Sequence, residues 1–331
     1  MIFLKKIKAA VIGIGNMGKN HVRIYHELEE TELVAISDLN EDLLIKSKKK
    51  YGCNTYTDYK KMLNEEEIDI ISIVTPTKTH KDVTLEVIEK NINFLLEKPI
   101  SNNLEDGQLI IEEANKKDVK FLIGHIERYN PAIQKIKEMI DDKVLGEITT
   151  ISAKRVGLFP PQIKDSNIII DVSIHDIEII NYLLNDKPDE VFVNGGKALN
   201  QEREDFVEIL MCYGPITGTI QSNWITPIKI RKLNITGTKG YAEIDYITQE
   251  LILYENDYQK KDDNFVEFVN TGQPKKIEIM IKSEEPLKLE IKNLIDSIKE
   301  DKTPLITGQQ ALDALEISLE INKKIKERNS F

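Results

Sequence analysis

The first third of the chain alternates continuous apolar runs with segments whose apolar residues recur at helical spacing. Uninterrupted apolar runs are typical of strands that are covered on both faces, and such strands form parallel sheets. We expect strands at residues 7–13, 32–38, 68–75, 93–97 and 120–124, and helices at 16–29, 41–51, 79–90 and 104–117. This alternation predicts an α/β domain built on a doubly wound parallel sheet.

The pattern changes near residue 124. Asn130 followed by Pro131 predicts a helix start, because asparagine caps helices and proline suits the first helical position. That helix is expected to end near residue 142. Glycine- and proline-containing turns then separate a series of short strands. We expect strands at 149–156, 190–194, 206–213, 218–224, 230–236, 241–246 and 251–254, with helices at 168–184, 284–300 and 308–328.

These elements predict a C-terminal α+β domain with a large open antiparallel sheet. We place the first domain at residues 1–124 and the second at 125–331, with the closing helix at 308–328 packing back on the first. An open sheet face that is poor in polar side chains suits a subunit interface. We therefore expect a homodimer or homotetramer formed through this sheet.

Composition limits the possible partners and compartments. A chain of 331 residues with 40% apolar and 31% charged residues fits a folded protein of about two domains. The net charge of −11 argues against nucleic acid as a partner, while a local basic cluster could still bind an anionic small molecule. Apolar runs all fall short of the about 20 residues of a membrane span. Cys53 and Cys212 lack disulfide or metal-site spacing, so we expect a cytoplasmic protein without a metal.

The segment from Gly13 to Gly18 reads G-x-G-x-x-G, follows a predicted strand and opens a predicted helix. Gly13 allows a tight turn, Gly15 lets the backbone approach a pyrophosphate, and Gly18 lets the helix pack on the strand. The amides around Asn16 and Met17 then receive the phosphate charge. The motif predicts a Rossmann dinucleotide site, and the alternative is a glycine turn without a ligand.

Asp38 ends the second predicted strand, about 20 residues beyond Gly18, where an acidic side chain accepts hydrogen bonds from the adenine ribose. Its charge would repel a 2′-phosphate, so NAD is favoured over NADP as cofactor. The alternative is that Asp38 caps the next helix.

Two further loops follow predicted strands and therefore belong to the ligand-binding edge of a parallel sheet. Thr75 and Pro76 are expected near the nicotinamide half, together with His80, which could equally cap its own helix. Glu97 is also expected there. Lys98 can hold a substrate hydroxyl, and Pro99, through a cis peptide bond, would turn Lys98 inward.

Asp171 and His175 are four residues apart at a predicted helix start, which places them on one helix face. A carboxylate beside an imidazole orients it and raises its basicity, as a general base requires. By spacing alone, a helix-start aspartate and a packed histidine would explain the pair. A metal site would need further ligands, and none with suitable spacing is visible.

The glycine loop, Glu97-Lys98-Pro99 and the Asp171/His175 pair together resemble the glucose–fructose oxidoreductase/inositol dehydrogenase/MocA family over essentially the whole chain. The resemblance implies oxidation of a secondary alcohol of a sugar or cyclitol, with hydride passing to NAD. It assigns proton acceptance to His175, hydroxyl binding to Lys98 and orientation of both to Asp171.

Two segments, 124–131 and 155–161, are similar to the branch of that family that oxidises UDP-sugars, although Tyr129 stands where phenylalanine is usual. This likeness implies UDP-N-acetylglucosamine as substrate, oxidised at its 3-hydroxyl. Arg155 and Arg231 are candidates to bind the pyrophosphate or the sugar, and structural salt bridges are the alternative for each. Arg128 is expected to brace the domain junction.

Two other functions remain open. A free-sugar or inositol dehydrogenase would share the fold but would need no diphosphate site. A non-catalytic NAD-binding regulator would also keep the fold, but the intact Lys98, Asp171 and His175 weigh against it.

Overall fold

The computed structural model describes residues 6–159, 166–200, 202–255 and 275–328. The chain forms two compact units, one of Met1–Ile126 and Leu287–Glu316, the other of Glu127–Pro286 and Ile317–Phe331. The predicted boundary after residue 124 lies close to the first junction. The predicted second domain, however, included Leu287–Glu316, which groups with the first unit because this segment packs there. Gly308, for example, leaves no room for a side chain against Ile111 and Phe121.

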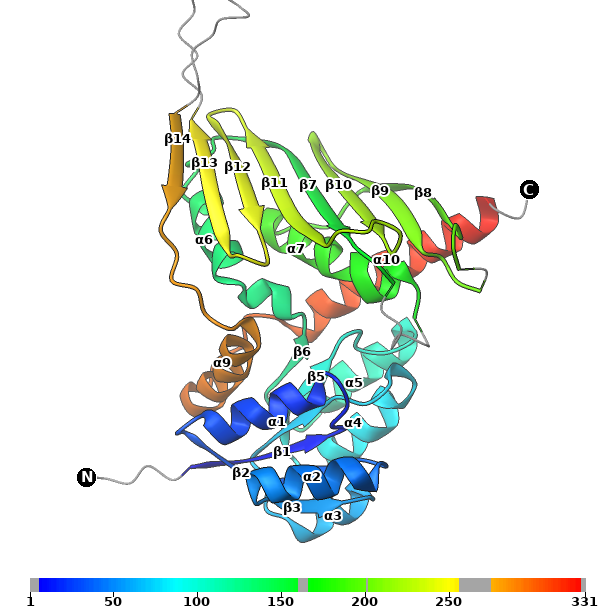
Figure 1. Cartoon of the computed structure of the whole chain (residues 1–331), viewed down its shortest axis with the longest axis vertical. Helices are drawn as coiled ribbons and strands as arrows, with labels where there is room; N and C mark the ends of the chain where they lie inside the picture. The colour runs from blue at the N-terminus through cyan, green and yellow to red at the C-terminus, as the bar shows by residue number, and fades with distance from the viewer. Residues whose placement is uncertain (1–5, 160–165, 201, 256–274, 329–331) are drawn as a thin grey trace, which may run out of the picture. The chain divides into compact units, whose positions relative to one another are not determined.

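The first unit contains a six-stranded parallel sheet in the order β3-β2-β1-β4-β5-β6 (Figure 1). Its strands are β1 Ile7–Ile12, β2 Thr31–Ser37, β3 Asn54–Tyr56, β4 Ile70–Ile73, β5 Asn93–Glu97 and β6 Phe121–Gly124. Chain order reverses between β1 and β4, and ligands bind such sheets at this point, beyond the carboxyl ends of the strands. The predicted Rossmann sheet is confirmed.

The helices of this unit are α1 Gly18–Glu27, α2 Glu41–Tyr51, α3 Tyr59–Glu65, α4 His80–Glu89, α5 Leu104–Lys116 and α9 Pro286–Glu300, with a short 3₁₀ turn η1 at Thr77–Thr79. The sequence did not predict β3 or α3. Both are short, and β3 lies at the sheet edge, where its three residues are half-buried or exposed and therefore carry no apolar run. In the described part of the chain, none of the helices has both the length and the apolar character needed to cross a bilayer.

The second unit contains an eight-stranded sheet in the order β14-β13-β12-β11-β7-β10-β9-β8. Its strands are β7 Ile148–Val156, β8 Glu190–Gly196, β9 Phe206–Tyr213, β10 Ile216–Asn223, β11 Ile230–Gly237, β12 Gly240–Asp245, β13 Glu250–Glu255 and β14 Lys275–Ile279. The predicted sheet is confirmed as mostly antiparallel, with β7 and β10 running parallel, and it contains β14, which the sequence did not predict. The chain leaves the sheet after β7 and returns through β8 and β9, which brings β10 beside β7.

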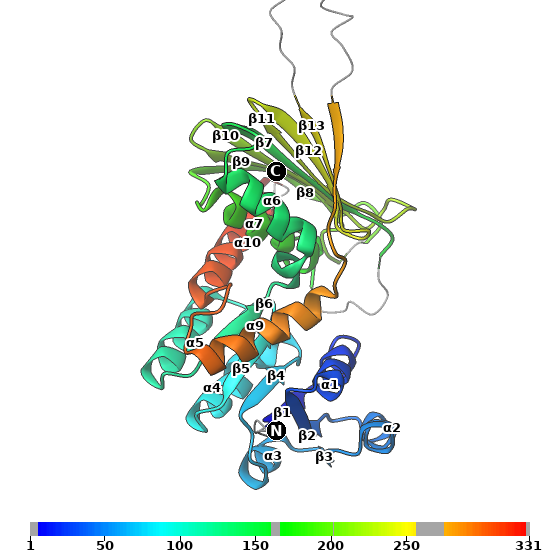
Figure 2. The same cartoon turned by 90° about the vertical axis from the view of Figure 1, so that its left-hand side faces the viewer.

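Helices cover one face of this sheet (Figure 2). They are α6 Pro131–Asp141, α7 Ile174–Leu184 and the second part of α10 Gly308–Arg328, preceded by the 3₁₀ turn η2 Ile126–Tyr129 and a π-helical turn η3 at Ile169–Ser173. Side chains along β9 alternate between buried and more exposed positions, as expected for a sheet with one packed and one open face. Asn130 caps α6 as predicted, since its side chain accepts a hydrogen bond from the Ala132 amide at 3.1 Å.

Candidate functional site

The glycine loop joins β1 to α1 at the switch point of the first sheet. Gly13 has φ +85°, a left-handed conformation that favours glycine, and a side chain there would meet the Val74 carbonyl. Gly15 is different, because a Cβ at this exposed position would have no atom of the described residues within 4 Å. Internal packing therefore does not require glycine at position 15. Close approach of an outside group, such as a pyrophosphate, explains it, so the loop fits a dinucleotide.

The amino end of α1 completes this phosphate cradle. The helix begins at Gly18, and its N-cap residue Met17 makes no side-chain capping bond within the described part of the chain. Asn16 is exposed beside it. Free amide N–H groups at a helix start are a favourable place for phosphate oxygens.

Asp38 lies directly after β2 and contacts the same loop. One carboxylate oxygen accepts a hydrogen bond from the Ile14 amide at 2.7 Å, and the other accepts one from the Asn40 amide at 2.8 Å. The side chain of Asn40, not of Asp38, caps α2 by accepting from the Leu43 amide. The capping alternative for Asp38 is therefore wrong, while its contact with the adenine ribose stays a prediction.

Three loops meet at the carboxyl edge of the first sheet, because Ile12, Ile73 and Leu96 lie in register on neighbouring strands. Thr75 and Pro76 follow β4, and the Thr79 hydroxyl donates to the Thr75 hydroxyl at 2.9 Å. The loops after β1, β4 and β5 thus form one continuous edge.

His80 is the first residue of α4 and is 1% exposed. Its ring nitrogens lie 2.9 Å from the carbonyl oxygens of Thr75 and Pro99, and burial lowers its pKa. Thr79 occupies the N-cap position, so His80 does not cap the helix. The ring links the loops after β4 and β5 at the carboxyl edge of the first sheet, which favours a positioning role for His80 over direct contact with the cofactor.

Glu97 and Lys98 follow β5 at this edge. The Lys98–Pro99 peptide bond is cis, as predicted. One oxygen of Glu97 lies 3.1 Å from Nε2 of His21, and the other accepts the Lys98 amide at 3.2 Å. His21 was missed from the sequence because it lies on the buried face of α1, where its spacing resembles that of ordinary core residues.

Asp171 and His175 lie in the second unit, at the start of the predicted helix. The structure differs from the prediction, since Asp171 belongs to the π-helical turn η3 and His175 to α7. The Asn167 side chain begins this segment by accepting from the Ile170 amide at 3.2 Å. Both Asp171 and His175 are half-buried. π-Helical turns inside α-helices often occur at functional sites, and sequence periodicity cannot reveal them.

Arg155 lies on β7 and is 5% exposed. Its guanidinium binds both carboxylate oxygens of Asp176, at 2.8 and 2.9 Å, and one oxygen of Glu127 at 2.7 Å. The aromatic ring of Tyr246 packs on it at 4.7 Å. This enclosure favours the salt-bridge alternative for Arg155 over substrate binding, because its charge is already neutralised.

Arg231 faces Arg155 in the register of the neighbouring strand β11. One terminal nitrogen donates to the carbonyl oxygens of Val156 and Ile230, at 2.6 and 2.8 Å. Burial, and then the positive charge of Arg155, lower the pKa of Arg231. Among the described residues, no carboxylate forms a direct ion pair with Arg231, although the negative charges of Asp176, Glu127 and Asp171 partly offset the lowering of its pKa. The guanidinium thus keeps donors and charge for an anion.

Arg128 is 1% exposed and forms an ion pair with the equally buried Glu178 of α7. Its guanidinium also packs over Tyr182 at 4.4 Å. These contacts lie within the second unit, and bracing of the domain junction by Arg128 stays a prediction. Of the segment 155–161, Pro160 and Pro161 lie outside the described residues.

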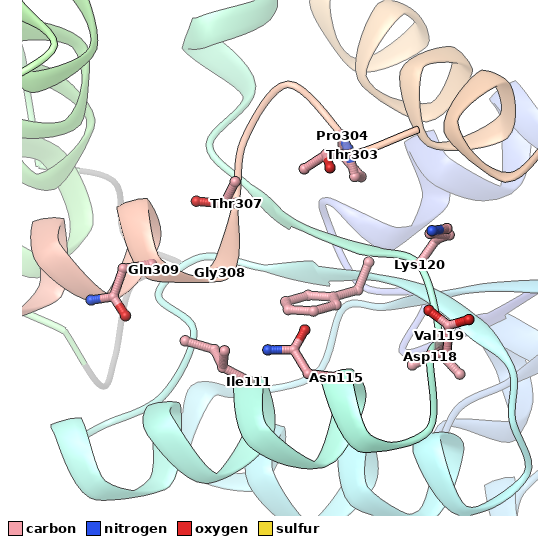
Figure 3. A pocket seen from close by; sticks show the side chains of 11 residues that line it. Ile111, Asn115, Asp118, Val119, Lys120, Thr303, Pro304, Thr307, Gly308 and Gln309 are labelled. Carbon is pink, nitrogen blue, oxygen red and sulfur yellow. The ribbon is translucent and has the colours of Figure 1, made fainter. Parts of the chain in front are cut away.

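A cavity of about 270 Å³ in the first unit lies elsewhere (Figure 3). It is lined by α5, by Phe121 at the amino end of β6 and by the loop from Thr303 to Gly308. Because it lies at the amino end of a strand, it does not coincide with the ligand-binding edge. In the described ranges, no group of three or more His, Cys, Asp or Glu side chains is arranged to hold a metal ion.

Comparison with known proteins covers most of the chain. The sequence model of the oxidoreductase family with an NAD-binding Rossmann fold, named GFO_IDH_MocA, matches residues 7–125, and the model of its C-terminal domain matches residues 133–243. The myo-inositol 2-dehydrogenase of Thermotoga maritima is 22% identical, over 98% of both chains. The UDP-N-acetylglucosamine 3-dehydrogenase of Acidithiobacillus ferrooxidans is 25% identical, over 75% of this chain and 77% of that protein.

The solved structure of the Acidithiobacillus ferrooxidans enzyme has the same fold. It superposes with a TM-score of 0.85 at 22% identity, over 98% of this chain and 99% of that one. The matches to both domain models, the two-sheet fold and the glycine loop all indicate the same family. The chain belongs to the GFO_IDH_MocA family and is an NAD-binding oxidoreductase.

Proposed function

We propose that the protein oxidises a secondary alcohol of a nucleotide sugar with NAD, and that its substrate is UDP-N-acetylglucosamine, oxidised at the 3-hydroxyl. The observation that carries this proposal is that Arg231, within the described chain, donates to backbone carbonyls and forms no ion pair with a carboxylate. A UDP-sugar brings a diphosphate into the site, so its enzyme needs a cation that is not already neutralised.

Arg231 meets that requirement better than Arg155. Arg155 is enclosed by Asp176 and Glu127, while Arg231 donates only to backbone carbonyls within the described chain. Its half-buried position also strengthens an ion pair, since water screens the charge less there. Asp171 of the proposed catalytic group is one of the acidic residues whose charge acts on Arg231, after Asp176 and Glu127.

The catalytic roles follow from the side chains available. NAD, when bound, supplies the acceptor for the hydride that leaves the substrate carbon. His175 accepts the proton of the hydroxyl, Lys98 binds and polarises the hydroxyl oxygen, and Asp171 orients His175. Removing a proton in step with hydride loss is the work of a general base, for which histidine has a suitable pKa range.

The relatives support two versions of this reaction. The similarity to a UDP-N-acetylglucosamine 3-dehydrogenase favours the nucleotide sugar. The match to a myo-inositol 2-dehydrogenase over nearly the whole chain favours a free cyclitol or sugar as the second candidate. Only the nucleotide sugar brings a diphosphate for Arg231, which pairs with no carboxylate among the described residues.

The test is NADH formation by the purified protein with NAD and a substrate panel. The panel contains UDP-N-acetylglucosamine, other UDP-sugars, free hexoses and inositols, and mass spectrometry follows the loss of two hydrogens from the substrate. Selective turnover of UDP-N-acetylglucosamine is expected. Turnover of a free sugar or inositol alone would remove the diphosphate site, and silence with every substrate, also with 2-oxoglutarate as hydride acceptor, would favour the regulator.

We also propose that subunits associate through the open face of the eight-stranded sheet. Phe192 and Leu210 pair across β8 and β9 on this face and are 54% and 38% exposed. Sedimentation should give a dimer or tetramer, and Leu210→Lys should shift it toward the monomer. A monomeric unmodified protein would contradict this assembly.

A further inference from the structure

A chain of four polar side chains runs from the carboxyl end of β5 into the interior of the first unit. Glu97 lies 3.1 Å from Nε2 of His21, and Nδ1 of His21 lies 3.0 Å from the Ser72 hydroxyl. That hydroxyl lies 3.0 Å from the phenol oxygen of Tyr25. The four residues come from β5, α1 and β4, so this hydrogen-bonded network links two strands of the first sheet to α1.

The direction of each hydrogen bond follows from the chemistry of the end groups. An ionised Glu97 can only accept, so His21 donates from Nε2. A neutral His21 then accepts at Nδ1 from the Ser72 hydroxyl, which in turn accepts from the phenol of Tyr25. Burial raises the pKa of Tyr25, so its phenol stays protonated. All donors thus point toward Glu97, and each bond strengthens the next.

The interior end of the chain does not suit proton transfer to water. Tyr25, Ser72 and His21 are each 0% exposed. The negative charge of Glu290, which is also fully buried, further raises the pKa of Tyr25. A network that ends on a phenol unable to ionise orients a group and does not carry protons away.

The group that it orients is the Glu97 carboxylate. The second oxygen of Glu97 accepts the Lys98 amide, and a side chain at Gly124 would come within 3.0 Å of that oxygen. The carboxylate is therefore held by His21 on one side, by the Lys98 backbone on another and by the surface of Gly124 on a third. His21 lies three residues beyond Gly18, on the helix that begins at the phosphate cradle.

We propose that His21 is a positioning residue for cofactor binding. It fixes Glu97, and through Glu97 the backbone at Lys98, relative to the helix that receives the pyrophosphate. The inference rests on the assignment of Glu97 to the cofactor site, but it does not depend on which sugar is the substrate.

The test compares two amide replacements that divide the two functions of the imidazole. In His21→Gln the amide can reach Glu97, as Nε2 does, whereas in His21→Asn it can reach only Ser72, as Nδ1 does. The dissociation constant for NADH is measured by fluorescence titration without any sugar. We expect His21→Asn to weaken NADH binding about ten- to hundredfold, which is the scale of one hydrogen bond to a charged group. The affinity of His21→Gln for NADH should stay within about threefold of that of the unmodified protein.

Two controls separate positioning from simple loss of stability. Ser72→Ala removes the interior support but leaves the His21–Glu97 contact, so NADH binding should change less than about threefold even if thermal stability falls. In a Glu97→Ala background, His21→Asn should have no further effect, because the residues act in series. Equal losses in His21→Gln and His21→Asn, or an undiminished effect of His21→Asn in the Glu97→Ala background, would overturn the proposal. A protein that binds NADH in this pattern but oxidises no UDP-sugar would contradict only the proposed function.

Discussion

Two arginines face one another across neighbouring strands of the second unit, yet their surroundings differ. Arg155 is enclosed by Asp176, Glu127 and the ring of Tyr246. Arg231, its partner in the strand register, donates to backbone carbonyls and pairs with no carboxylate in the described ranges. The chain neutralises Arg155 with two carboxylates, whereas Arg231 keeps donors that an anionic ligand can bind.

The largest expected effect is on stability at Arg155. Arg155→Met would leave Asp176 and Glu127 buried without their cation, which should lower the free energy of unfolding by about 3–5 kcal/mol. Urea denaturation measures it. Lys143→Met is the matched control, because it breaks an exposed ion pair with Glu147 and should cost less than about 0.5 kcal/mol. Equal effects of the two substitutions would show that the ion pairs of Arg155 stabilise the fold no more than an exposed pair does, which would contradict its structural role.

Catalysis should fail next, without loss of fold. His175→Ala and Lys98→Ala should each lower kcat about 10²-fold or more, since His175 accepts the hydroxyl proton and Lys98 binds the hydroxyl oxygen. NADH affinity and the urea midpoint should remain close to those of the unmodified protein. Turnover near the original rate in both variants would contradict the proposed roles.

Substitution of Arg231 should weaken substrate binding without lowering the stability of the fold. Arg231→Met should raise the KM for UDP-N-acetylglucosamine about ten- to hundredfold through the loss of charged hydrogen bonds, with a change in unfolding free energy below about 1 kcal/mol. Arg231→Lys, which keeps the charge but not the fork of donors, should be intermediate. A large loss of stability in Arg231→Met would place it with Arg155 as a structural residue.

The smallest expected effect concerns cofactor choice at Asp38. Asp38→Asn keeps an oxygen that can accept from the Ile14 amide but removes the negative charge. NADP should then bind about tenfold better relative to NAD, the scale of one charged contact. Asp38→Ala should in addition weaken NAD itself. An unchanged preference in both variants would remove Asp38 from the ribose site.

Much of the first unit is predictable because its signals are local in the sequence. The glycine loop, Asp38 and the Glu97-Lys98-Pro99 turn each follow a strand directly, so the parallel sheet brings them to one edge. In the second unit, the partners of the site residues are distant in the sequence and follow no such pattern. Arg155 is 21 residues from Asp176 and 28 from Glu127, and nothing in its own segment shows that it is neutralised.

The roles of buried polar residues also could not be predicted from the sequence. His21 and His80 have the spacing of core residues, and only the structure shows which carboxylate or carbonyl each one meets. The π-helical turn at Asp171 was also hidden, because one extra residue in a turn leaves the apolar pattern nearly unchanged.

The central claim is that Arg231 recognises a phosphate-bearing sugar, and a series of substrates of decreasing charge tests it most directly. We would measure kcat/KM for UDP-N-acetylglucosamine, N-acetylglucosamine 1-phosphate and N-acetylglucosamine, with the unmodified protein and with Arg231→Met. Activity should fall as phosphates are removed, and Arg231→Met should abolish most of that preference. Equal or better turnover of the free sugar, with a preference that Arg231→Met does not change, would contradict the proposed substrate.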